Sequence, residues 1–170
     1  PEYDSNRSGG LIAINLKEGD EVVSAATVTN ADQLLLISEQ GMSLRFSSDD
    51  ESLRPMGRST SGVIGMKFRG KDRLLAMVVV GSDQAKDFYL ITATDGGFGK
   101  RTSLDEYRLQ GRGGIGVKAA KIDESSRGVL VGALIVKTSD EILLITSSGS
   151  VMRTPVSEIR ETGRDTMGVR

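Results

Sequence analysis

The chain has 170 residues, a length that suits one domain, and 22 Lys and Arg balance 23 Asp and Glu to a formal net charge of −1. It contains no Cys and no His, which excludes disulfides, zinc sites built on these residues and the usual Ser-His-Asp or Cys nucleophiles. No apolar run approaches the length of a membrane span, so we expect no membrane partner. Chemistry on carboxylate, Lys or Tyr side chains stays possible, although with the motifs below we expect no catalytic residue, no metal site and no small-molecule substrate. The near-neutral charge alone does not suggest a nucleic-acid partner.

Short apolar runs rich in Val, Ile and Leu follow one another along the chain, separated by clusters of Gly, Asp, Asn and Ser. No stretch keeps an apolar period of 3.6 residues over three turns, so the sequence predicts strands rather than helices. The predicted strands are, in chain order, residues 22–28, 34–37, 74–80, 88–91, 129–136 and 142–145. Short strands with regular turns are typical of a sandwich, a barrel or a propeller.

Three segments repeat one pattern, an apolar strand, a glycine turn and a second strand that ends in Arg. LLLISEQGMSLR at 34–45 aligns without a gap to ILLITSSGSVMR at 142–153, while FYLITATDGGFGKR at 88–101 carries two extra residues. Each copy predicts a β-hairpin. Gly41, Gly97 and Gly149 occupy its turn, where a residue without Cβ takes a positive φ at little cost.

A second pattern, G-R-x-x-x-G-V, follows each hairpin, as GRSTSGV at 57–63, GRGGIGV at 111–117 and GRDTMGV at 163–169. The first glycines of the copies lie 54 and 52 residues apart. We interpret the glycine pair as a tight loop in which backbones approach closely. A further Arg lies four residues before the Arg of each copy, at Arg54, Arg108 and Arg160.

The segment after each motif is repeated as well. Residues 10–28 align without a gap to 62–80 and, with two extra residues, to 116–136. Three patterns that recur in one order about every 50 residues favour propeller blades of four strands over a β-solenoid. The sequence therefore predicts an all-β, propeller-like fold in an incomplete ring with open edges at both ends. The predicted repeats are 1–30 (partial), 31–84, 85–138 and 139–170 (partial).

Equivalent positions of a repeat array lie on one face or rim, so the recurring Arg residues predict a periodic cationic track. Regularly spaced guanidinium groups can neutralise the phosphates of a duplex with little dependence on base sequence. For a single Arg, pairing with a neighbouring acid in a loop is an equally good interpretation, and only the ordered set favours a polyanion. Residues 85–138 hold 9 Lys and Arg against 6 acids, so we expect DNA to contact this repeat most strongly.

The segment QGRGGIG resembles the seven-residue box Q-R-R-G-G-K-G of the C-terminal domain of the DNA gyrase A subunit. IAINLKEGDE, RPMGRSTSGV, GFGKRT, MRTPVSEIR and GRDTMGV are also similar to that family, so the resemblance covers essentially the whole chain. Two positively charged residues of the box are replaced, which implies a secondary copy, with the principal box outside this chain. The box-like residues are Gln110, Gly111, Arg112, Gly113, Gly114, Ile115 and Gly116, of which Gly111 replaces an Arg and Ile115 a Lys.

This resemblance implies a six-bladed β-pinwheel, in which blades exchange strands with their neighbours and a basic outer rim wraps DNA. It implies three partners in the cytoplasm at the nucleoid, which are double-stranded DNA, the remainder of the gyrase A subunit, and the gyrase B subunit. The cleavage Tyr, the metal-binding carboxylates and the ATP site of the family belong to other domains. The resemblance therefore implies a chain that is non-catalytic alone and holds no cofactor, inside a topoisomerase that uses ATP and Mg²⁺ to introduce negative supercoils.

Two alternatives remain open at this stage. The C-terminal domain of a topoisomerase IV subunit shares the fold, although the motifs above favour gyrase. A protein-interaction propeller of the chromosome-condensation-regulator type would have no role on DNA, and its Arg residues would support loops. The predicted DNA-binding residues are Arg45, Arg54, Arg58, Lys100, Arg101, Arg108, Arg112, Lys118, Arg153 and Arg164.

Overall fold

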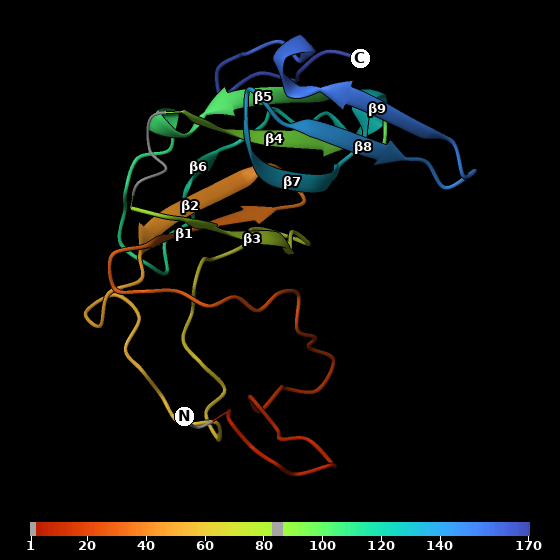
Figure 1. The fold of residues 1–170 in the computed structure, drawn as a ribbon. Helices are drawn as coiled ribbons and strands as arrows, with labels where there is room; N and C mark the ends of the chain where they lie inside the picture. Colours follow the sequence, from red (N-terminus) through yellow and green to blue (C-terminus); the bar gives the residue numbers. More distant parts are fainter. Residues whose placement is uncertain (1–2, 83–86) are drawn as a thin grey trace.

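The computed structural model describes residues 3–82 and 87–170, which form three small antiparallel sheets (Figure 1). The strand orders are β3-β1-β2-β6, β5-β4-β7 and β8-β9. The strands are β1 (Gln33–Ser38), β2 (Met42–Ser47), β3 (Leu74–Val80), β4 (Phe88–Thr94), β5 (Gly99–Ser103), β6 (Val117–Lys118), β7 (Leu130–Lys137), β8 (Glu141–Ile145) and β9 (Val151–Pro155). Short helical turns lie at η1 (Leu104–Glu106), α1 (Glu124–Arg127) and η2 (Val156–Glu158).

The three predicted hairpins are present as β1–β2, β4–β5 and β8–β9. Their turn glycines, Gly41, Gly97 and Gly149, have φ values of 79°, 79° and 83°, as predicted. The register of the pairs is the same in all three hairpins, with Leu35 opposite Arg45, Ile91 opposite Arg101 and Leu143 opposite Arg153. The three Arg residues therefore hold structurally equivalent positions.

Three strands of each of the two sheets at 31–84 and 85–138 come from one repeat, and the next repeat reaches back to add a strand or a bridge. Strand β3 pairs with β1 of its own repeat, and β7 pairs with β4 in the same way. Strand β6 belongs to the repeat at 85–138, which we call the second repeat, but pairs with β2 of the repeat at 31–84, which we call the first. A bridge between Gly99 and Val169 repeats this contact one repeat later. The first sheet is therefore a four-stranded blade that borrows one strand from its neighbour, and the predicted all-β, propeller-like fold is confirmed.

Apolar side chains fill the spaces between successive sheets, which are stacked in chain order (Figure 1). Leu35 and Ile37 of β1 face the second sheet, whereas Leu34 and Leu36 pack against the opposite side of the first. Strand β1 is thus buried on both faces, which explains its continuous apolar sequence. Between the second and third sheets, the buried residues are Ile91, Val136, Ile142 and Val156.

Residues 22–28 form no strand, so this prediction is wrong. The segment aligns with β3, and β3 is held by the hairpin of its own repeat. Residues 1–30 contain no such hairpin, so the pairing partner is missing and Val22 and Val23 are exposed. Residues 3–30 accordingly run below the sheets as an irregular segment (Figure 1). The repeat boundary predicted between residues 84 and 85 lies outside the described residues.

Candidate nucleic-acid interface

The second glycine of the G-R-x-x-x-G-V motif lies close to the backbone of the preceding repeat in two of the three copies. Gly116 has a φ of 83°, and an added Cβ would collide with the carbonyl oxygen of Ser43. Gly168 has a φ of 81°, and its Cβ would lie 2.6 Å from the carbonyl oxygen of Gly99. The close approach predicted for the motif is confirmed at these two positions, but not at Gly62, whose Cβ would meet only the Ile14 side chain at 3.8 Å. At the first glycine it is wrong, since a Cβ on Gly111 would meet no atom within 4 Å.

The Arg of each motif donates a hydrogen bond to a backbone carbonyl of the repeat before it. The bonds run from Nη1 of Arg58 to Ile12 (3.2 Å), from Arg112 to Ile64 (2.6 Å) and from Arg164 to Lys118 (2.8 Å). The acceptors are equivalent too, since each lies two residues after the second glycine of its own copy or, for Ile12, after the aligned Gly10. The motif Arg therefore makes the same contact between repeats three times.

The predicted residue Arg45 is turned into the protein and is 9% exposed. Its Nε donates to Oε1 of Gln33 (2.6 Å), and its Nη1 donates to the carbonyls of Leu104 (2.9 Å) and Tyr107 (3.1 Å) in the next repeat. Burial lowers the pKa of the guanidinium from its ordinary value, and the carboxylate of Asp105 opposes that shift. Arg45 thus joins two repeats from the inside.

The other two hairpins differ in the residue that lies diagonally across from this Arg, two positions before its paired residue on the neighbouring strand. The guanidinium of Arg101 lies over the Tyr89 ring, 4.9 Å from its centroid. Its Nε and Nη1 are buried and have no hydrogen-bond partner among the described residues. Arg153 is exposed and pairs with Glu141 at 2.6 Å. Tyr89 and Glu141 occupy the position of Gln33, so the strand neighbour decides which kind of contact the Arg makes.

Lys100 is buried as well, with 1% of its surface exposed. Its ammonium donates to the carbonyls of Gly163 (2.9 Å) and Arg164 and to Oγ1 of Thr166 (3.3 Å), so it supports the third motif loop from below. Burial lowers the pKa of Lys100 to about 8, although the carboxylate of Glu106 opposes the shift. Like the guanidinium of Arg45, the ammonium of Lys100 therefore makes its hydrogen bonds to groups inside the protein.

The box-like segment 110–116 is docked on the first repeat mainly through its backbone. The N–H groups of Gln110 and Gly113 donate to the carbonyls of Arg45 (2.8 Å) and Gly65 (2.7 Å), and the Gly114 carbonyl accepts from Lys67 N–H (2.8 Å). Gly111 is exposed, and the other six residues of the segment are half-buried, namely Gln110, Arg112, Gly113, Gly114, Ile115 and Gly116.

The remaining predicted cations lie at the surface. Lys118 is exposed and 3.3 Å from Asp165, and Arg153 has its partner Glu141, but exposed pairs of this kind contribute only about 0–1 kcal/mol. Arg54 and Arg108 are exposed, and so is Arg160, which the site prediction left out although its register was visible in the sequence. We call Arg54, Arg108 and Arg160 the arginine column.

Lys67 and Lys121 are two further exposed cations that the site prediction missed. They occupy equivalent positions of successive repeats, and the alignment of 62–80 with 116–136 carries the signal that would have found them. Within residues 3–82 and 87–170 there is no cluster of three or more side chains suited to hold a metal. The same residues contain no helix long and apolar enough to cross a membrane.

Hairpin repeats that exchange strands, with one exposed Arg at the same place in each, define a propeller-type repeat domain. The family model described as "DNA gyrase C-terminal domain, beta-propeller" matches residues 2–29, 32–81, 89–137 and 140–170. The chain belongs to this family, which sets aside the chromosome-condensation-regulator type of propeller.

Two curated relatives support this assignment along the chain. The DNA gyrase A subunit of Streptomyces coelicolor is 59% identical over 174 residues, which cover 99% of this chain and 20% of the relative. The DNA gyrase A subunit of Mycobacterium tuberculosis is 52% identical over 169 residues, with the same two coverages. The chain therefore spans about a fifth of the length of these relatives.

Two solved structures share the fold. A C-terminal domain of DNA topoisomerase IV superposes with a TM-score of 0.88 at 27% identity, covering 98% of this chain and 50% of the other. A DNA gyrase A C-terminal domain superposes with a TM-score of 0.83 at 30% identity, covering 95% and 53%. The fold alone does not separate the two topoisomerases, whereas the sequence relatives favour gyrase.

Proposed function

We propose that this chain is a non-catalytic part of a gyrase A subunit that binds duplex DNA along the arginine column and promotes its wrapping. The observation that carries the proposal is that Arg54, Arg108 and Arg160 recur in register in three successive repeats and are exposed in each. Equivalent positions in a repeat array face one side, so these guanidinium groups form a row. A row of cations suits the regular phosphates of a duplex and reads little base sequence.

Other surface cations strengthen the row. Lys67 and Lys121 are exposed beside the motif loops, and Lys118 and Arg153 are each paired with an exposed carboxylate that a phosphate can replace. Arg45 and Lys100 donate hydrogen bonds to carbonyls of the next repeat inside the protein, so they hold repeats together and do not contact DNA. The net charge of −1 is compatible with binding, because the distribution of charge rather than its sum sets the local field.

The proposed setting is a gyrase holoenzyme. The relatives are named as A subunits of DNA gyrase, which supports two protein partners, the remainder of such a subunit together with a gyrase B subunit. In this proposal ATP and Mg²⁺ act in other domains, the present chain uses no cofactor of its own, and it works at the nucleoid in the cytoplasm. Negative supercoiling would then depend on how the wrapped DNA is presented to those domains.

An electrophoretic mobility shift with the 170-residue chain tests the proposal. Duplexes of equal length and unrelated sequence should shift at similar protein concentrations at low salt, and the affinity should fall steeply as salt is raised. Absence of a shift at low salt, or an affinity independent of salt, would contradict it. Ligation of nicked circular DNA in the presence of the chain adds a second readout, because a changed linking number reports wrapping and its handedness.

A further inference from the structure

We propose that the motif Arg residues, Arg58, Arg112 and Arg164, are staples between repeats that position the arginine column and do not themselves bind phosphate. This inference rests on the proposed function for its effect on DNA, but the staple itself is argued from contacts within the chain. It gives the two recurring sets of Arg residues different tasks, although both repeat at the same spacing in the sequence.

The side chain of Arg112 shows the staple most completely. Its Nε donates to the carbonyl of Ser52 (2.8 Å) and its Nη1 to the carbonyl of Ile64 (2.6 Å), both in the preceding repeat. Two acceptors on two nitrogens of one planar group use the fork geometry of guanidinium, which a lysine ammonium cannot reproduce. Arg112 is half-buried, so much of its surface is already withdrawn from a ligand.

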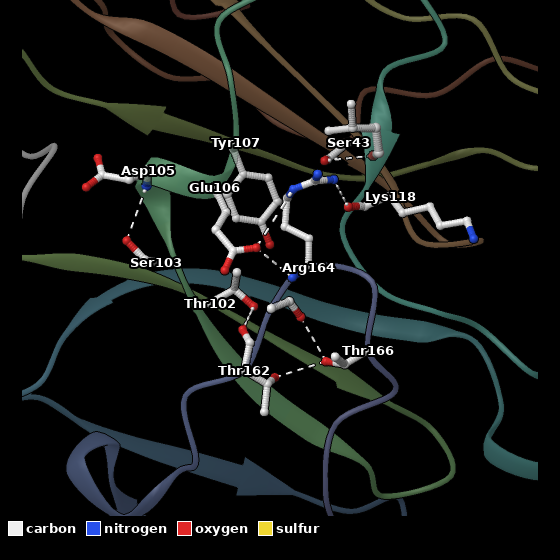
Figure 2. A network of polar contacts seen from close by, with 12 residues as sticks. Ser43, Thr102, Ser103, Asp105, Glu106, Tyr107, Lys118, Thr162, Arg164 and Thr166 are labelled. Carbon is white, nitrogen blue, oxygen red and sulfur yellow. Dashed lines mark hydrogen bonds and ion pairs between the residues drawn. The ribbon is translucent and has the colours of Figure 1, made fainter.

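Arg164 repeats the Nη1 contact one repeat later, whereas its buried Nε makes no hydrogen bond among the described residues. Its Nη1 donates to the carbonyl of Lys118 (2.8 Å), and its Nε lies 4.0 Å from the carboxylate of Glu106. Glu106 occupies the position of Ser52, so the Nε is aimed at the same place in both repeats. Figure 2 shows the Arg164 side chain between Glu106 and Lys118, with Tyr107 beside it. The backbone N–H of Arg164 also donates to Glu106 (2.9 Å).

A backbone hydrogen bond accompanies each staple at an equivalent place. The pairs are Asn15 N–H to Thr60 (3.0 Å), Lys67 N–H to Gly114 (2.8 Å) and Lys121 N–H to Thr166 (3.0 Å). Each motif loop is therefore fastened to the preceding repeat by its Arg side chain and by its backbone, three times over. In a repeat array each repeat contacts only its neighbours, so this recurring contact sets the position and orientation of each repeat relative to the one before it.

The staple lies close to the arginine column along the chain. Arg108 is four residues before Arg112, and the stretch between them is held by the Gln110 N–H, which donates to Arg45 (2.8 Å), and by the Leu109–Arg45 bridge. Because both ends of this short stretch are fixed, the docking of the loop sets the position from which the Arg108 side chain extends into solvent. Loosening Arg112 should therefore disturb the row of guanidinium groups without removing a phosphate ligand.

Charge-preserving variants of the 170-residue chain separate the two tasks. Arg112→Lys should lower the thermal unfolding midpoint and speed hydrogen exchange of the Lys67 N–H, which bonds to Gly114 in the same interface. The matched control Arg108→Lys should change neither, because Arg108 is exposed. These two measurements need no DNA, so a chain that failed to bind DNA would refute the proposed function and leave the staple to be judged separately.

The salt dependence of DNA affinity separates a positioning role of Arg112 from a direct contact with phosphate. At a temperature where the variants are folded, Arg108→Ala should reduce the slope of log affinity against log salt by about 0.9, the value for one lost phosphate contact. Arg112→Lys should weaken binding about two- to tenfold with the slope unchanged. Native-like stability and exchange in Arg112→Lys, or a slope reduced by about 0.9 in a folded Arg112→Ala, would overturn the inference.

Discussion

The substitution Gly116→Ala tests how tightly consecutive repeats are docked. Gly116 has a φ of 83°, and the left-handed region costs an alanine about 1–2 kcal/mol. The new Cβ would also collide with the Ser43 carbonyl, so the loop has to move away from the first repeat. That movement strains the Gly113–Gly65 and Lys67–Gly114 hydrogen bonds, worth about 1 kcal/mol each. We expect a total loss of about 3–4 kcal/mol in the free energy of unfolding.

Thermal unfolding followed by circular dichroism measures this loss. At about 2–4 °C per kcal/mol for a chain of this size, the midpoint should fall by roughly 6–16 °C. Gly111→Ala, in the same loop, is the matched control, since its Cβ would meet no atom within 4 Å, and its midpoint should move by less than a quarter of that. Equal midpoints for the two variants would refute the docking described for the motif.

Two more predictions concern the buried cations. Folded Lys100 releases its proton near pH 8 and an unfolded lysine near pH 10.5, so the unfolded state binds more protons between these values. The free energy of unfolding of the parent chain should therefore rise between pH 8 and pH 10 relative to that of Lys100→Met, as measured by urea unfolding. Urea midpoints that rise equally in the parent and in Lys100→Met would contradict this. Arg45→Met should cost about 2–3 kcal/mol in urea unfolding, because the Leu104 and Tyr107 carbonyls lose a buried donor. Arg45→Lys should restore little of that loss, and full restoration would show that the fork geometry is unimportant.

Much of the fold could be predicted because the same three sequence patterns recur in each repeat. The glycine turns, the alternation of hairpin and motif, and the register that makes Arg45, Arg101 and Arg153 equivalent are all local patterns. The strand at 22–28 could not be judged in this way, since whether it forms depends on a hairpin partner that residues 1–30 do not contain.

The site was harder to predict than the fold, because burial is decided by the neighbouring repeat. Arg45 and Arg54 are both periodic, yet Arg45 meets two carbonyls of the next repeat while Arg54 is exposed. Lys100 reads as a surface cation, but the loop at 163–168 closes over it. Such contacts join residues about 60 positions apart, and no local pattern reveals which periodic cation will find an acceptor there.

The most direct test of the central claim compares the salt dependence of duplex affinity in the parent chain and in a triple variant. Arg54→Ala, Arg108→Ala and Arg160→Ala together should reduce the slope by about 2–3, since each removes one phosphate contact, while the unfolding midpoint stays close to that of the parent. Arg73→Ala is the control, because Arg73 is exposed and paired with Glu39 at the other end of the hairpin. A slope unchanged in the triple variant, or reduced by about 0.9 in Arg73→Ala, would contradict DNA binding along the arginine column.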